Sequence, residues 1–330
     1  MIFLHLVANE ITKMIRKRRF QVVLVILFAL MAVFSYAEQQ AASKLATQLG
    51  TTDWHVRLQQ QITSQTNHMR SPFLSAAEKT AIQANIREEQ YELDYNIDPF
   101  APGAATFMRT FMDEGIVLLI PMLVIVIASD MVSSEVSAGT IKMLLTRGVS
   151  RARVLASKLV ALFLLVGLLL SAVAVASYAV SGIFFGYKGF GLPVLMGFHT
   201  TATGYVDVSH VFTVPQWKYL IMTFGLGFFA CLSIASLAFM VSTLFRSTAS
   251  SMGIMMAALI GGTLLTALAS SWTTAKYLPV VNLRLSGYLN GSPPAMEGMT
   301  FPFSLTVLLI WSIAAIAVSF LVFMRRDVMG

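Results

Sequence analysis

The chain has 330 residues and a formal net charge of +7 at pH 7. Only 12% of its residues are charged, about half the share found in soluble proteins, and 56% are hydrophobic. These values exclude a soluble globular protein and predict an integral membrane protein.

The first 19 residues predict a helix that lies on the membrane surface. Val7, Ile11 and Met14 recur at helical spacing, with Glu10 and Lys13 on another face. That pattern is typical of an amphipathic interfacial helix. The alternative, a basic flank to the first span, explains the Lys and Arg residues but not the apolar spacing.

Six apolar runs approach or exceed the roughly 20 residues that a helix needs to cross a bilayer. The predicted spans are 20–37, 114–132, 159–185, 219–244, 251–271 and 303–324. The fifth contains Gly261 and Gly262, which suit close helix packing. The predicted fold class is therefore an all-α integral membrane protein with six transmembrane helices.

The distribution of basic residues predicts the orientation. With the N-terminus in the cytoplasm, the cytoplasmic segments carry 13 of the 23 Lys and Arg residues but only 4 of the 16 Asp and Glu residues. Basic residues concentrate on the cytoplasmic side of membrane proteins, where they also attract anionic lipid. We therefore expect both termini, including the 325–330 tail, to be cytoplasmic, and we read the net charge as contact with membrane lipid rather than with nucleic acid.

Residues 38–113 predict a helical extracytoplasmic insertion between the first two spans. One helix is expected from Asp53 to Met69, and a capping box formed by Ser75 and Glu78 opens another. The acidic run at 88–94 is expected to be a solvated helix face, and a metal site there is a weaker alternative. Irregular chain then returns to the membrane.

Two further outer segments follow. Residues 186–218 predict a Gly-rich loop, in which His199, Asp207 and His210 offer a weak zinc alternative to an ordinary loop. Residues 272–302 are moderately apolar and predict an outer loop with a re-entrant piece that dips toward the bilayer.

The sequence contains no catalytic constellation. It lacks a G-x-x-x-x-G-K-[ST] loop, HExxH, G-x-S-x-G and C-x-x-C. The middles of the predicted spans are nearly free of charged residues, which disfavours an ion-coupled carrier and an intramembrane hydrolase. We therefore expect no enzyme, no metal site and no cofactor in this chain.

Residues 133–158 form a charged interruption between two spans. Ile141, Leu144 and Leu145 make a short apolar stripe at helical spacing, Gly148 follows as a helix end, and Ser150 stands at the N-cap of the next helix. The pattern predicts helix, break, helix, with surface for a partner protein. A basic loop that only anchors two spans at anionic lipid needs neither the stripe nor the caps.

The same segment resembles the signature of bacterial ATP-binding-cassette (ABC) transporter permeases of the type-2 export family, which includes permeases implicated in sodium extrusion and peptide-antibiotic resistance. The acid Glu135, the Gly139-Thr140 pair, the Leu144-Leu145 pair, Ser150-Arg151 and the closing Lys158 match its spacing. Many members carry Pro at the position of Gly148, and either residue breaks a helix. The resemblance extends less specifically over the whole chain.

The resemblance implies a bacterial cytoplasmic-membrane complex. Two permeases, either two copies or one with a paralogous permease, would pair with two cytoplasmic ATPase subunits that hold ATP and magnesium, and a coupling helix of the 133–158 loop would dock on each ATPase. The residues expected to contact the ATPase are Glu135, Gly139, Thr140, Ile141, Leu144, Leu145, Arg147, Ser150 and Arg151.

The implied function is export of a lipophilic, amphipathic or peptide substrate, or of an ion. The alternative is an ABC-linked membrane subunit that transmits a signal or force through its extracytoplasmic domain without moving cargo. The identity of the substrate does not follow from the sequence.

Overall fold

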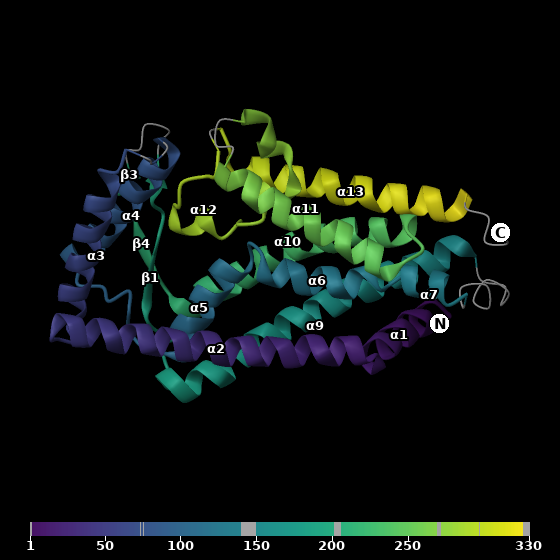
Figure 1. Cartoon of the computed structure of the whole chain (residues 1–330), viewed down its shortest axis with the longest axis horizontal. Helices are drawn as coiled ribbons and strands as arrows, with labels where there is room; N and C mark the ends of the chain where they lie inside the picture. The colour runs from purple at the N-terminus through teal and green to yellow at the C-terminus, as the bar shows by residue number, and fades with distance from the viewer. Residues whose placement is uncertain are drawn as a thin grey trace.

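The computed structural model of the chain describes residues 2–72, 74, 76–139, 150–200, 206–268, 272–296 and 298–325. Within these residues, six helices are long and apolar enough to span a membrane, and the strands form two small two-stranded sheets. The long helices run side by side along the long axis of the molecule (Figure 1). The all-α membrane class is confirmed, and the chain is a multi-pass membrane protein.

Four of the predicted spans lie within single helices that extend beyond the apolar runs. These are α2 (Arg18–Leu49), α9 (Arg151–Phe185), α10 (Gln216–Leu244) and α13 (Phe301–Arg325). The predicted fifth span corresponds to α11 (Thr248–Leu268), and its last three residues lie outside the described ones. The core of the bundle is formed where α6, α9 and α10 meet.

The second span differs from the single helix predicted over 114–132. The helix breaks after Gly115 and resumes as α6 (Leu119–Ser129), followed by a turn and the short α7 (Ser133–Ser137). Pro121 explains the break, because it has no N–H to donate to the carbonyl four residues earlier and is tolerated in the first turn of a helix.

Helix α5 (Ala104–Gly115) belongs to the packed bundle, although most of it falls within the predicted outer insertion. Phe107, Phe111 and Met112 are buried, and the helix packs against α9 and α10. In its packing, α5 therefore belongs to the helix bundle, and the outer insertion ends before it.

The rest of the insertion is a helical hairpin beyond the end of α2. Helix α3 (Trp54–Met69) packs against α4 (Ala76–Asp94) at the left of Figure 1. The predicted helix from Asp53 to Met69 is confirmed: the Asp53 side chain caps it by accepting a 3.0 Å hydrogen bond from the backbone N–H of His55. Ser75, the predicted cap of α4, lies outside the described residues.

Helix α1 (Ile2–Arg16) forms as predicted but turns a different face inward. Val7, Glu10 and Met14 are buried together against α9, whereas Ile2 and Leu4 are exposed. The placement of Glu10 outside the apolar face is thus wrong, and the physical reason is an ion pair described below.

The segment 186–218 contains short strands rather than only loop. Strand β1 (Pro193–Met196) pairs antiparallel with β4 (Phe212–Pro215), and β2 (His199–Thr200) pairs with β3 (Val206–Asp207). Leu195, Phe198 and Val206 pack with Ala84 of α4. The strands therefore join the helical hairpin to the bundle.

The segment after α11 folds into short helical turns at the same end of the molecule. They are η1 (Thr273–Tyr277), η2 (Pro279–Asn282) and α12 (Gly287–Asn290). A Cβ added at Gly262 of α11 would lie 2.9 Å from the Val280 Cβ, so glycine permits η2 to pack on α11. The Trp311 indole N–H donates to the Tyr277 carbonyl at 2.8 Å, which holds η1 against α13.

Candidate functional site

The predicted docking segment is only partly described. Thr140, Ile141, Leu144, Leu145 and Arg147 lie outside the described residues, as does the predicted break at Gly148. The described members flank them on both sides, so the structure bears on the base of the loop.

Glu135 faces the bundle, so its predicted role in ATPase docking gains no support from the structure. Its side chain is only 2% exposed. Its carboxylate forms ion pairs with Lys13 of α1 and with Lys158 of α9, the latter at 2.7 Å between Oε2 and Nζ. An acid that is held in this way fixes α7 against α1 and α9.

Glu135 belongs to a larger group of buried and half-buried charges, which we call the charge cluster. Its members come from α1, the start of α2, the α6–α7 segment and α9, and they are Glu10, Lys13, Lys17, Arg19, Asp130, Glu135 and Lys158. These elements lie at the right-hand end of Figure 1, where α1, α7 and the end of α13 gather.

Two ion-paired centres make up the charge cluster. Lys158 Nζ lies 2.8 Å from Glu10 Oε2 as well as 2.7 Å from Glu135. Asp130 receives Lys17 at 2.5 Å and Arg19 at 2.6 Å, one on each carboxylate oxygen. Lys17 also donates to Ser134 Oγ at 3.0 Å. Every acid of the cluster therefore has at least one cation.

The pairing accounts for the burial of these charges. Lys158 is 0% exposed and Glu10 is 4% exposed, positions that an unpaired ion would not tolerate. Burial, and next the nearby charge of Lys158, lower the pKa of Lys13 from 10.5 to about 8. The charge cluster thus ties the two ends of the 140–149 loop, carried by α7 and α9, to α1.

The other described docking residues have structural roles at the loop ends. Gly139 has a φ of +72°, a left-handed conformation that favours glycine where α7 ends. Ser150 stands at the predicted N-cap position of α9, but its side chain makes no capping hydrogen bond. Arg151 Nη1 donates to the Met324 carbonyl of α13 at 3.4 Å.

The sequence did not predict the charge cluster, because its residues were interpreted separately, as topology signals, as the polar face of the first helix or as parts of the docking signature. One signal was present: Val7, Glu10 and Met14 recur at i, i+3 and i+7, so Glu10 lies on an apolar face of its helix. Its partner Lys158 is 148 residues away along the chain, a separation that no periodicity reveals.

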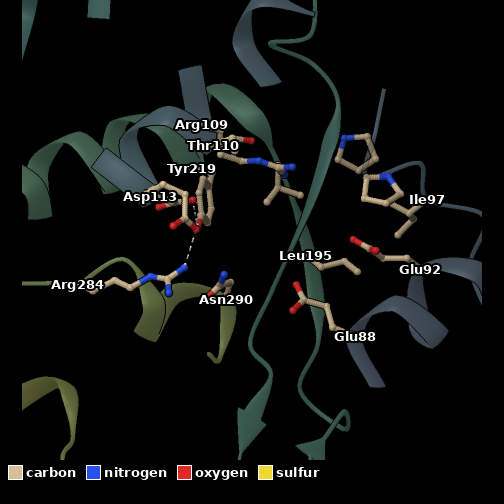
Figure 2. A pocket seen from close by; sticks show the side chains of 14 residues that line it. Glu88, Glu92, Ile97, Arg109, Thr110, Asp113, Leu195, Tyr219, Arg284 and Asn290 are labelled. Carbon is tan, nitrogen blue, oxygen red and sulfur yellow. Dashed lines mark hydrogen bonds and ion pairs between the residues drawn. The ribbon is translucent and has the colours of Figure 1, made fainter. Parts of the chain in front are cut away.

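A second site is a cavity of about 210 Å³ at the opposite end of the bundle, which we call the acidic cavity (Figure 2). It lies where α4 meets α5, β1, α10 and the 284–290 segment. Its lining residues are Glu88, Glu92, Ile97, Pro99, Arg109, Thr110, Asp113, Glu114, Pro193, Val194, Leu195, Tyr219, Arg284 and Asn290.

Glu88 and Glu92 are one helical turn apart on α4 and face the cavity from one side (Figure 2). Burial raises the pKa of Glu88 from 4.5 to about 7, against the opposing pull of Arg109. Burial, and next the charge of Glu88, raise the pKa of Glu92 to about 8. Both carboxylates therefore titrate near neutral pH.

The opposite wall of the acidic cavity carries the remaining charges. Tyr219 donates its hydroxyl to Asp113 Oδ2 at 3.3 Å, and Arg284 Nη2 lies 3.4 Å from Glu114 Oε1. With Arg109, the lining holds two cations and four carboxylates. The balance is acidic, in contrast to the charge cluster.

The acidic run of α4 is not the solvated face that the sequence predicted. Glu89 is 8% exposed and accepts hydrogen bonds at 2.7 Å from the side-chain amides of Gln61 and Gln65 on α3. Glu88 and Glu92 point the other way, into the cavity. The acidic run therefore holds α4 against α3 by hydrogen bonds on one side and lines a cavity on the other.

No group of three His, Cys, Asp or Glu side chains within the described part of the chain is arranged to hold a metal ion. His199 and Asp207 are cross-strand neighbours of β2 and β3, and Asp207 Oδ1 accepts from the backbone N–H of Ser209 at 2.9 Å. The zinc alternative for these residues gains no support.

Comparison with known proteins places the chain in a family. The model of the family described as "Protein of unknown function (DUF2705)" matches residues 78–329. The chain is 29% identical over 327 residues to "Uncharacterized protein YhcI" of Bacillus subtilis (strain 168), covering 98% of this chain and 99% of that one. It is also 29% identical over 213 residues to "Uncharacterized membrane protein YdbK" of the same organism, and the match covers 64% of this chain and 78% of that one. The chain therefore belongs to the DUF2705 family.

Proposed function

We propose that the chain is the permease subunit of a bacterial ABC exporter in the cytoplasmic membrane. It would move a lipophilic, amphipathic or peptide substrate, or an ion, out of the cytoplasm, driven by a separate ATPase docked on the 133–158 loop. The observation that carries the proposal is the charge cluster, because it mechanically connects both ends of that loop to the membrane helices.

The charge cluster supplies a route for force. Helices α7 and α9 lie on either side of residues 140–149 in the chain, and they carry Glu135 and Lys158, which form an ion pair. Because Lys158 also binds Glu10, a displacement of the loop displaces α1 as well. A docked ATPase would thus move α1, the end of α6 and the start of α9 as one unit.

The loop itself would provide the contact. Leu144 and Leu145 would fill an apolar groove of the ATPase, and Arg147 and Arg151 would meet acidic surface on it. ATP and magnesium would be bound by the partner, which agrees with the lack of a nucleotide-binding motif in this sequence. Two ATPase copies and a second permease would complete the complex.

Two loop variants test the proposal when the chain is co-expressed with a candidate ABC ATPase encoded beside its gene. We expect Leu144→Ala and Arg147→Glu to abolish ATPase co-purification and transport-coupled ATP hydrolysis, with normal membrane insertion. Arg246→Glu is the matched control, since Arg246 is exposed in the short connection between α10 and α11 and is predicted to lie on the same membrane side. Full ATPase binding and coupled hydrolysis in both loop variants would exclude the docking role.

The second candidate function is transmission of a signal or force through the helical hairpin of α3 and α4 without transport. The acidic cavity favours it, because α4 shares this cavity with α5 of the bundle and with the membrane-spanning α10. Replacement of residues 50–97 by a Gly/Ser linker spares α5 and the spans. ATP hydrolysis that no candidate substrate accompanies across the membrane, and that is lost in this deletion, would favour signalling over export.

A further inference from the structure

We propose that the acidic cavity binds an organic cation, a single alkylamine or alkylguanidinium group such as a basic amino-acid side chain carries. This inference does not depend on the exporter function, because it rests on the lining of the cavity alone. Four observations lead to it: the charge balance, an unsatisfied buried oxygen, the size of the space and the apolar part of its wall.

The charge balance leaves room for one more cation. Of the two cations in the lining, Arg284 is paired with Glu114, which is the most solvent-exposed of the four acids with a side chain 71% exposed. Arg109 remains to oppose Glu88, Glu92 and Asp113. Glu88 and Glu92 have no hydrogen bond or ion pair within the described residues, so a bound cation would be their first close partner.

Asp113 supplies a second, independent observation. Its Oδ2 accepts from Tyr219, whereas its buried Oδ1 makes no hydrogen bond of standard geometry within the described residues, and the nearby Ser286 hydroxyl interacts with this carboxylate. A buried carboxylate oxygen without a well-placed donor carries a desolvation penalty. An N–H group in the cavity would remove this penalty, and ammonium and guanidinium groups provide several N–H donors.

Carboxylates on the two walls of the acidic cavity face one another across the space. In Figure 2, Glu88 and Glu92 project from α4 on one side, and Asp113 and Tyr219 lie on the other. The high pKa values of the two glutamates have the same origin, because they reflect burial that too few nearby cations offset. A bound cation would lower both.

The size and the wall favour an organic cation over a metal ion. The described residues include no three carboxylates close enough together to coordinate one ion. At about 210 Å³, the cavity is smaller than drug-sized pockets, which start at about 300 Å³, and it suits one side-chain-sized group. Ile97, Pro99 and Leu195 form an apolar side that can cover the methylene chain of an alkylamine.

The experiment uses the purified full-length chain in detergent micelles at pH 7.5. The probes are N-acetyl-arginine amide and N-acetyl-lysine amide, and the neutral control probe of similar length is N-acetyl-norleucine amide. We expect saturable binding of the cationic probes by saturation-transfer NMR and at least tenfold weaker binding of the neutral one.

The variants locate the site. The double variant Glu88→Gln/Glu92→Gln should weaken the binding of the cationic probes at least tenfold, and Asp113→Asn should also weaken their binding. Asp94→Asn is the matched control, since Asp94 is exposed on the same helix and lies outside the cavity. Size-exclusion elution identical to that of the unchanged chain, checked for each variant, separates lost binding from lost folding.

Three outcomes would overturn the proposal. One is equal binding of the neutral and the cationic probes. Another is cationic binding that the double variant and Asp113→Asn leave intact, which would place the site elsewhere. The third is saturable binding of Ca²⁺ or Na⁺ that Glu88→Gln/Glu92→Gln removes, with no binding of either organic probe.

Discussion

The charge cluster and the acidic cavity differ in how their carboxylates are paired with cations. At the loop end, Glu10, Asp130 and Glu135 are nearly inaccessible, and each receives a Lys or Arg within ion-pair distance. At the hairpin end, Glu88 and Glu92 face a cavity and have no such partner among the residues that the structure describes. Both regions are rich in acids, and they differ in whether the fold itself provides the cations.

The difference indicates two kinds of role. A buried ion network whose charges are all paired holds elements in one arrangement, and removal of one member strongly destabilises the fold. A polar site with unsatisfied groups destabilises the folded protein, and a bound partner that satisfies those groups stabilises it. The difference agrees with the two roles proposed above, transmission of force by the charge cluster and recognition of a ligand by the acidic cavity.

Removal of the central cation should produce the largest effect. Lys158→Met leaves Glu10 and Glu135 buried with less compensation, and breaking a buried pair in this way costs about 3–5 kcal/mol of unfolding free energy. Denaturant unfolding in mixed micelles measures it. Arg153→Met is the control on the same helix, because Arg153 is exposed. A loss as small as that of the control would show that the charge cluster does not hold these helices together.

The acidic cavity should respond to pH in a way that the charge cluster does not. Since the folded-state pKa values of Glu88 and Glu92 lie near 7 and 8, against 4.5 for the unfolded chain, the folded state retains protons that the unfolded state releases. Stability should therefore fall as pH rises from about 5 to about 8, by about 2 kcal/mol once partial exposure is allowed for. The charged groups that bear on these two carboxylates are Arg109, Glu89, Asp98, Asp113, Glu114 and Arg284.

Melting temperatures between pH 5.5 and pH 8.0 check this prediction. Glu88→Gln/Glu92→Gln should flatten the profile, and Asp94→Asn should leave it unchanged. A profile that keeps its slope in the double variant would mean that other groups titrate.

The smallest expected effect concerns the end of α7, next to the charge cluster. Gly139→Ala forces a side chain into the left-handed conformation, at a cost of about 1 kcal/mol, and its Cβ would meet no other atom of the described residues within 4 Å. Gly225→Ala within α10 is the control, because its surroundings are equally open and its φ is helical, so it should be neutral or stabilising. Equal effects of the two changes on unfolding would contradict a specific turn at Gly139.

Local patterns explain which parts of the fold were predictable. Apolar runs, the Asp53 cap and the helical spacing of α1 depend on residues within a few turns of one another, and they are readable along the chain. The break before α6 was readable in principle from Pro121. The strands at 193–215 were missed because they are short and their pairing is set by packing on α4.

The candidate sites divide in the same way. The signature that predicts a docking segment is local, so the sequence by itself determined the membrane class, the six apolar spans and the position of the loop. Only the tertiary structure decided that Glu135 turns inward, that Glu10 joins Lys158 and that Glu88 and Glu92 line a cavity. The physical reason is that the state of a charge depends on which distant segments approach it: a cation close by buries the acid as an ion pair, and without one the acid stays at an open cavity.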